Sequence, residues 1–153
     1  MDTEKLQTLF DKWGKKLRIT PTWDLKMKLV EDESWRKSGD IKIDCENRKA
    51  VVLINTVNPK WENIEEVIVH ELFHLKLYPL DQVTENLISA CFETGTDAYE
   101  FAMTQFMSAL EQTVEEMAKT YLLEHGENRS LSFQNVERKQ SFDELFRGLK
   151  NLE

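Results

Sequence analysis

The hydrophobic positions in the first part of the chain follow two different periods. An amphipathic helix is predicted where they recur at helical spacing, at Leu6, Leu9, Phe10, Trp13 and Leu17. Pro21 interrupts this pattern. A half-buried strand is predicted where they then alternate with polar residues, at Trp23, Leu25, Met27 and Leu29.

Two further strands are predicted next. Ile41 and Ile43 alternate with polar residues, which predicts a strand over 41–45, and an unbroken apolar run follows at 50–54. The residues between the two strands are polar and include Asn47, so they suit a hairpin turn. An unbroken apolar run of this length is typical of a more central strand.

The hydrophobic period becomes helical again from residue 61. Pro59 stands where it can begin a helix over 61–77, and Pro79 is expected to end it. A separate short helix is predicted over 82–91, and a long helix over 97–124.

The last part of the chain is more polar, and residues 125–131 are expected to be loosely held. Ser141 and Glu144 have the spacing of a capping box. They predict a short amphipathic helix with the apolar residues Phe142, Leu145, Phe146 and Leu149. We expect this helix to pack on the rest of the protein, with the binding of a partner as the alternative.

These elements together predict an α+β fold. A small twisted sheet would pack on the helix 61–77 and on the long C-terminal helix 97–124. We expect a domain over residues 1–124 that includes the N-terminal helix, followed by a polar tail over 125–153. The first part contains no repeat or low-complexity linker that would divide it.

Composition and charge narrow the class of protein. The chain has 153 residues, of which 41% are hydrophobic and 31% charged, as in a globular domain. Its net charge of -8 argues against a nucleic-acid partner, because the basic field that attracts phosphates is missing. It has no apolar run of membrane-spanning length and no signal-like start, so we expect no membrane partner and a cytoplasmic location.

The residues 70–74 read His-Glu-Leu-Phe-His. On a helix, His70 and His74 lie one turn apart on the same face, so both imidazoles can bind one metal ion. Glu71 lies beside the first histidine, where it can take a proton from a water that the metal activates. The motif lies in a strongly apolar run, where unpaired polar side chains are costly. These residues predict one zinc ion per chain, with Glu71 as general base.

A catalytic zinc usually has a third protein ligand. The extended motif with a third histidine is absent, because positions 77 and 80 are leucine. A carboxylate on a later helix is then the expected ligand, and His125 is an outside candidate. We favour Glu111, which lies at the edge of the apolar stripe of the long helix. The other candidate ligands are Glu93, Asp97, Glu100 and Glu115, of which Glu115 is expected to face solvent more than Glu111 does.

The order of strands, the helix with His70-Glu71-x-x-His74 and a later acidic helix resembles the zincin metallopeptidases. Because the chain lacks the third motif histidine, it is more similar to the gluzincin-type branch of this family. The run 69–75 followed by Pro79 resembles small zincin-like proteins of bacteria and phages. The same compact architecture occurs in the repressor-cleaving metallopeptidases of mobile elements. In those families the third ligand is a glutamate in a pattern that 111–118 resembles, with Val114 where alanine is more common.

The resemblance implies a zinc-dependent metallopeptidase that hydrolyses a peptide or protein substrate. Zincins bind an extended peptide along the edge strand beside the active-site helix, which here would come from 39–55. The alternative is a catalytically inactive zincin-like protein that binds or regulates a partner. The oligomeric state is not predicted.

Several other polar residues are candidates for supporting roles. Proton donation or stabilisation of the reacting oxygen is possible for Tyr78, Tyr99, Tyr121 and His125. Asp81 could orient a metal-binding histidine, although a loop or capping role is the simpler expectation.

Overall fold

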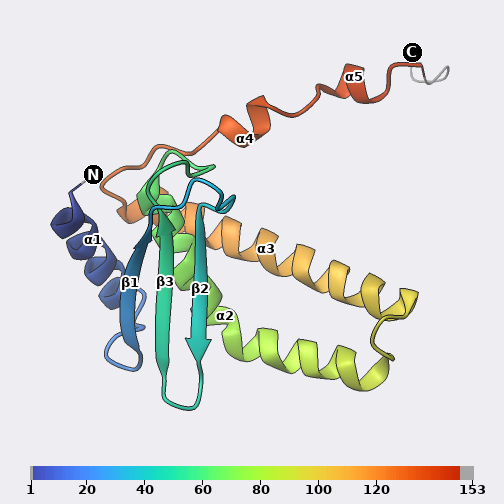
Figure 1. Cartoon of the computed structure of the whole chain (residues 1–153), viewed down its shortest axis with the longest axis horizontal. Coiled ribbons are helices and arrows are strands. Elements are labelled where there is room, and N and C mark those ends of the chain that lie inside the picture. The colour runs from blue at the N-terminus through green and yellow to red at the C-terminus, as the bar shows by residue number, and fades with distance from the viewer. Residues whose placement is uncertain (1, 149–153) are drawn as a thin grey trace.

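The computed structural model describes residues 2–148 and has the α+β architecture predicted from the sequence (Figure 1). A mixed three-stranded sheet is combined with two long helices and several shorter ones. The elements are α1 (Thr3–Lys16), β1 (Asp24–Val30), β2 (Gly39–Asp44), β3 (Lys49–Asn55), α2 (Ile64–Cys91), α3 (Asp97–His125), α4 (Gln134–Glu137) and α5 (Phe142–Leu145).

The sheet has the strand order β1-β3-β2. β1 pairs parallel to β3, with Asp24 opposite Lys49, and β2 pairs antiparallel to β3, with Gly39 opposite Ile54. The prediction that the apolar run at 50–54 forms the central strand is therefore confirmed. β2 forms the edge of the sheet next to α2.

The hydrophobic core lies between the sheet, α1 and the first half of α2, and α3 closes it. Each element contributes an apolar face, because the periods of two and 3.6 residues bring these side chains to one side. The fully buried members include Phe10, Trp13, Val52, Ile54, Val67, Ile68, Val69, Leu72, Val114 and Leu122.

The long helix α2 differs from its predicted limits. It begins at Ile64, where the side chain of Asn63 caps it by accepting a hydrogen bond from the backbone N–H of Glu65. It then continues through Pro79 to Cys91, so the predicted end at Pro79 and the separate helix over 82–91 are wrong. Proline removes one helical hydrogen bond, and we attribute the continuation of the helix to its contact with α3.

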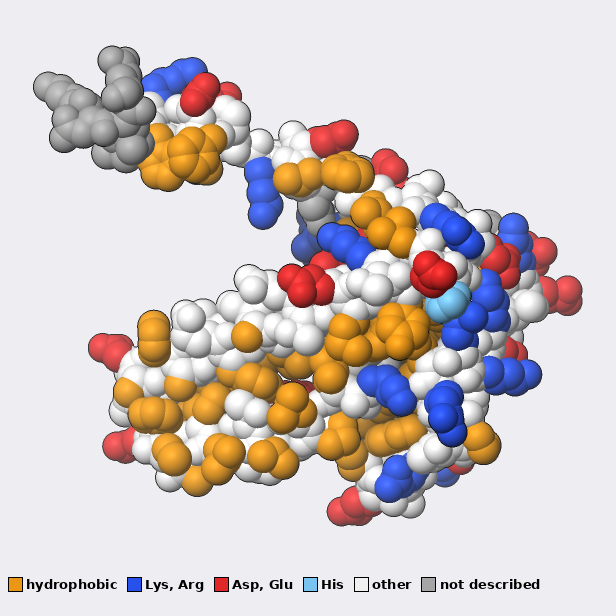
Figure 2. Space-filling view, turned by 180° about the vertical axis from the view of Figure 1, so that it is seen from behind, with side chains coloured by type: hydrophobic (Ala, Val, Ile, Leu, Met, Phe, Trp, Pro, Cys, Tyr) orange, Lys and Arg blue, Asp and Glu red, His pale blue; other side chains and the backbone are white. Residues whose placement is uncertain are grey.

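The second half of α2 and the first half of α3 form a helical hairpin that extends beyond the sheet (Figure 1). Apolar side chains gather along one face of this hairpin (Figure 2). The exposed large hydrophobic residues of the hairpin are Leu80, Val83, Leu87, Phe92, Phe101 and Met107.

The segment that follows α3 is fixed to the start of α2, so the expectation that 125–131 is loosely held is wrong. The side chain of Asn63 donates to the backbone oxygens of Asn128 and Ser130. The carboxylate of Glu65 accepts from the backbone N–H groups of Glu127 and Asn128. The division of the chain at residue 124 stays a prediction.

The predicted capping box of the tail is present. Ser141 accepts from the backbone N–H of Glu144, whose side chain accepts from the backbone N–H of Ser141. The expected packing of this helix is not observed, because Phe142 and Leu145 are 72% and 60% exposed. Leu149, which was expected to extend its apolar face, lies outside the described residues.

None of the helices in residues 2–148 combines the length and the apolar content needed to cross a membrane.

Candidate metal centre

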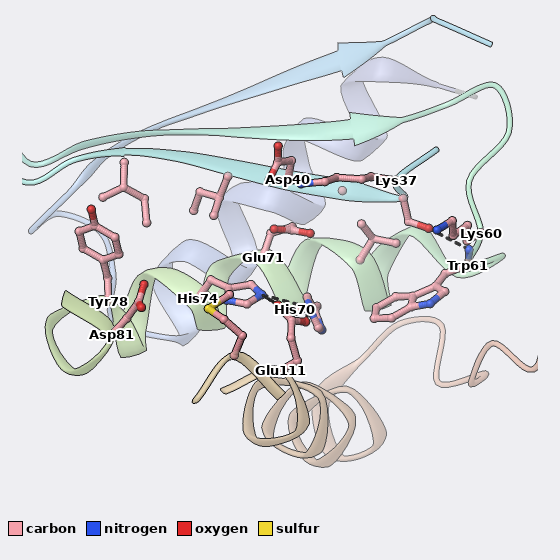
Figure 3. Close-up of a pocket in the computed structure, with 16 residues that line it drawn as sticks. Lys37, Asp40, Lys60, Trp61, His70, Glu71, His74, Tyr78, Asp81 and Glu111 are labelled. Atoms are coloured by element: carbon pink, nitrogen blue, oxygen red, sulfur yellow. Dashed lines mark hydrogen bonds and ion pairs between the residues drawn. The ribbon is translucent and has the colours of Figure 1, made fainter. Parts of the chain in front are cut away.

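The two histidines of the motif point into one cleft from the buried part of α2 (Figure 3). His70 and His74 are one helical turn apart, and their Nε2 atoms are separated by 3.2 Å. Their side chains are 9% and 18% exposed. The spacing in the sequence therefore brings two nitrogen donors together, as the motif predicted.

Glu111 approaches the same point from α3. Its Oε2 atom lies 3.5 Å from Nε2 of His70, and its Oε1 atom lies 3.5 Å from Nε2 of His74. The buried stripe formed by Leu110 and Val114 packs α3 against α2 and leaves Glu111 at the edge of the contact. The structure thus brings the favoured carboxylate to both histidines.

The spacing of these three residues fits a zinc ion. One donor atom from each of His70, His74 and Glu111 lies within 4.8 Å of the others. A tetrahedral zinc with bonds of 2.0–2.2 Å holds its donors roughly 3.3 to 3.6 Å apart. The observed separations of 3.2 and 3.5 Å are close to that range. Two imidazoles and a carboxylate are also a donor set that suits zinc.

Three of the other candidate ligands lie far along the hairpin. Asp97 and Glu100 are in the first turn of α3, and Glu93 lies in the connection before it. Asp97 is about 21 Å along the helix axis from Glu111, at 1.5 Å for each residue. His125 is equally far in the other direction, where its ring contacts Tyr121. None of these four residues belongs to the donor cluster among the described residues.

Glu115 has a different position from the one expected. Its Oε2 atom accepts a hydrogen bond from Nδ1 of His70 at 3.1 Å. In a neutral ring this contact places the proton on Nδ1 and leaves the lone pair of Nε2 free for a metal. Its side chain is 26% exposed, against 52% for Glu111, so the expectation that Glu115 faces solvent more than Glu111 is wrong.

The carboxylates favour positive charge at this point. Burial lowers the pKa of His70, but hydrogen bonds to Glu111 and Glu115 outweigh it and raise the pKa to about 9. The hydrogen bond to His70 in turn lowers the pKa of Glu111. Burial and the neighbouring charge of His70 lower the pKa of His74. The same field would stabilise a bound metal cation.

Glu71 lies on the β2 side of the cleft, beside the two histidines (Figure 3). It is 7% exposed, and burial raises its pKa to about 7, against the opposing effect of His70. Such a carboxylate can both accept and release a proton near neutral pH. The structure therefore places the predicted general base next to the three donors.

Gly39 allows β2 to approach this carboxylate closely. A Cβ atom at residue 39 would lie 2.5 Å from Oε1 of Glu71 and 2.7 Å from Cγ1 of Val67. Both distances are shorter than van der Waals contacts, so a side chain at this position would displace Glu71 or the strand. In the sequence, Gly39 only precedes the strand predicted over 41–45.

The cleft around these residues has a volume of about 450 Å³ and is bounded by β2, α2 and α3. Lys60 and Trp61 lie at one end, and the ring of Trp61 meets His70 edge-on at a centroid distance of 4.9 Å. Tyr78 and Asp81 lie at the opposite end (Figure 3). The cleft is long enough to have distinct ends on either side of the histidines.

Of the tyrosines considered from the sequence, Tyr78 lines the cleft. Tyr121 packs on Phe73, with ring centroids 5.3 Å apart, and Tyr99 lies in the first turn of α3. Asp81 is part of α2 and not of a loop. Tyr78 follows His74 by four residues. A predicted helix that continued beyond Pro79 would therefore have placed this tyrosine on the same face as His74.

Comparison of the chain with protein-family models, with curated proteins and with solved structures finds no match.

Proposed function

We propose that this protein is a zinc-dependent metallopeptidase of the zincin type. The convergence of His70, His74 and Glu111 beside the buried carboxylate of Glu71 carries this proposal. The spacing of the donors suits zinc, and the general base lies on the side of the cleft where β2 could hold a peptide.

A zinc ion held by His70, His74 and Glu111 would supply Lewis acidity, which lowers the pKa of a water molecule and polarises a peptide carbonyl. Glu71 accepts the proton of that water as it attacks, and later donates the proton to the leaving amine. Glu115 keeps the ring of His70 in the required orientation through Nδ1.

The edge strand β2 suits an extended substrate. One side of β2 pairs with β3, so the backbone groups of its other side are available to a further strand. A peptide added there would run along the cleft past Glu71. We therefore propose a peptide or an unfolded protein segment as substrate. The cytoplasmic location predicted from the sequence stays a prediction.

The first experiment combines metal analysis with peptide cleavage. We expect about one zinc per chain in the wild type and in Glu71→Gln, and loss of zinc in His74→Ala and Glu111→Ala. Glu93→Ala is the matched control, because it removes a carboxylate that lies outside the donor cluster. A peptide library should be cleaved by the wild type and at least about 100-fold more slowly by Glu71→Gln.

Two results would contradict the proposal. A wild type that binds no zinc when zinc is supplied would exclude the metal centre. Equal cleavage by the wild type and Glu71→Gln would exclude the role of Glu71. Zinc binding without cleavage of any peptide would instead support the catalytically inactive binding protein.

A further inference from the structure

Asp81 is a carboxylate that lines the cleft. It lies on α2, at the end of the cleft that also contains Tyr78 (Figure 3). Its Oδ1 atom is buried and has no hydrogen-bond partner in the part of the chain that the structure describes. Two other carboxylates around the cleft differ in this respect, because Glu111 contacts both histidines and Asp40 pairs with Lys37 at 3.1 Å.

The surroundings of Asp81 do not neutralise its charge. Burial raises its pKa, and the negative charge of Glu85 raises it further. The sequence has no lysine or arginine between Lys76 and Lys119, so this hairpin offers no cation of its own. A carboxylate that is partly removed from water is stabilised when a cation binds to it.

Asp81 lies on the same helix as the proposed metal ligand His74, at a distance that an extended peptide could span. It follows His74 by seven residues on one continuous helix, which corresponds to about 10.5 Å along the axis. An extended peptide covers that distance in about three residues. The opposite end of the cleft has the basic residue Lys60, so the two ends differ in charge.

We propose that Asp81 and Tyr78 form a subsite for a basic side chain, lysine or arginine, about three residues from the bond that is cleaved. The carboxylate binds the ammonium or guanidinium group, and the ring of Tyr78 packs along the aliphatic part of that side chain. This subsite rests on the proposed peptidase function and adds to it a substrate class, peptides with a basic residue on one side of the cleavage point.

The test uses binding as well as cleavage. Zinc-loaded Glu71→Gln is titrated with fluorescein-labelled nonapeptides whose central residue is Lys, Gln or Glu and whose other residues are uncharged, and anisotropy gives the Kd values. We expect the Lys pool to bind about five- to tenfold more tightly than the Gln pool. Adding Asp81→Asn should remove this preference, and Asp81→Lys should shift it toward the Glu pool.

Asp11→Asn is the matched control, because it removes the same charge from the exposed surface of α1. It should leave the preference for lysine unchanged. Cleavage of a mixed library by the wild type should place the basic residue on one side of the cleaved bond only.

The outcomes separate the subsite from the peptidase function. A preference for lysine that survives Asp81→Asn, or that Asp11→Asn removes equally, overturns the subsite. Cleavage with no charge preference overturns the subsite and keeps the peptidase. Binding with a lysine preference that depends on Asp81 but without cleavage supports the subsite and contradicts the peptidase. No binding of any pool and no cleavage overturns both.

Discussion

At the scale of single residues, the donor cluster follows from local geometry and was largely predictable. Two histidines four residues apart on a helix meet wherever that helix lies, so His70 and His74 needed no knowledge of the fold. Glu111 needed only the position of the apolar stripe of the long helix. The role of Glu115 could not be predicted, because it depends on how α3 is rotated against α2, and one turn of a helix separates two similar carboxylates.

Replacing Glu115 separates its role from that of Glu111. We expect Glu115→Ala to weaken zinc binding by about 10- to 100-fold, since His70 loses the acceptor that orients its ring. Glu111→Ala should weaken it further, and Glu116→Ala, an exposed neighbour on α3, should not change it. Competition with a chromophoric chelator measures the affinities. Equal losses in Glu115→Ala and Glu111→Ala would make Glu115 a metal ligand itself.

Glu66, a buried carboxylate outside the group of His70, His74 and Glu111, makes the stability of the fold depend on pH. Glu66 is 1% exposed, and burial raises its pKa above 4.5, against the effect of the hydrogen bonds from Ser132. The folded protein therefore binds this proton more tightly than the unfolded chain. The stabilising contribution of protonated Glu66 is complete below about pH 4.5 and is lost as the pH rises through the folded pKa.

Glu66→Gln should make the free energy of unfolding less dependent on pH above about pH 4.5. Urea unfolding at a series of pH values from 4 to about 8 gives the free energy of unfolding of both proteins. We expect the difference between the variant and the wild type to move in favour of the variant as the pH rises. A difference that is constant across this range would contradict the raised pKa of Glu66.

At the scale of elements, the strands and the limits of α3 were predicted well, whereas α2 was not. Alternation and helical periods report local burial, which is why β1, β2 and β3 agree with their predicted ranges. Pro79 is a strong local signal for the end of a helix, but it competes with the contact between α2 and α3 along the hairpin. That contact is between residues far apart in the sequence, so the local pattern could not show it.

Replacing Pro79 tests this competition. Pro79→Ala restores a backbone N–H inside α2 and removes the clash of the ring with the preceding turn, while the residue itself is exposed. We expect the free energy of unfolding to rise by roughly 1–3 kcal/mol, measured by urea denaturation. A decrease in stability would show that the proline itself is needed for packing against α3.

The close approach of β2 to α2 gives a second prediction at this scale. Gly39→Ala should leave zinc binding unchanged, because residue 39 does not belong to the donor cluster. It should lower kcat for peptide cleavage by at least about tenfold, since the new Cβ would displace the carboxylate of Glu71. Metal analysis and cleavage kinetics measure the two effects. If the variant binds zinc and cleaves peptides as fast as the wild type, glycine is not needed at residue 39 to leave room for Glu71.

At the scale of the whole molecule, the segment after α3 holds the first turn of α2 in place. Glu65 is 2% exposed and accepts hydrogen bonds from the indole of Trp13 and from the backbone of Glu127 and Asn128. Glu66 accepts from the backbone and the side chain of Ser132. Two buried carboxylates thus link α1, α2 and the chain that follows α3, and they do so within two turns of His70.

Shortening the chain at two points tests where the stable unit ends. A chain ending at Phe133 keeps every donor to Glu65 and Glu66, and the exposed apolar residues of α5 contribute no packing to the rest. Its free energy of unfolding should lie within about 1 kcal/mol of the full chain. A chain ending at Glu124 leaves both carboxylates without their backbone donors, and it should lose at least about 3 kcal/mol. Urea unfolding followed by tryptophan fluorescence compares the three proteins. If the two shortened chains are equally stable, the contacts of residues 126–132 do not support the start of α2, and the domain ends at 124 as the sequence predicted.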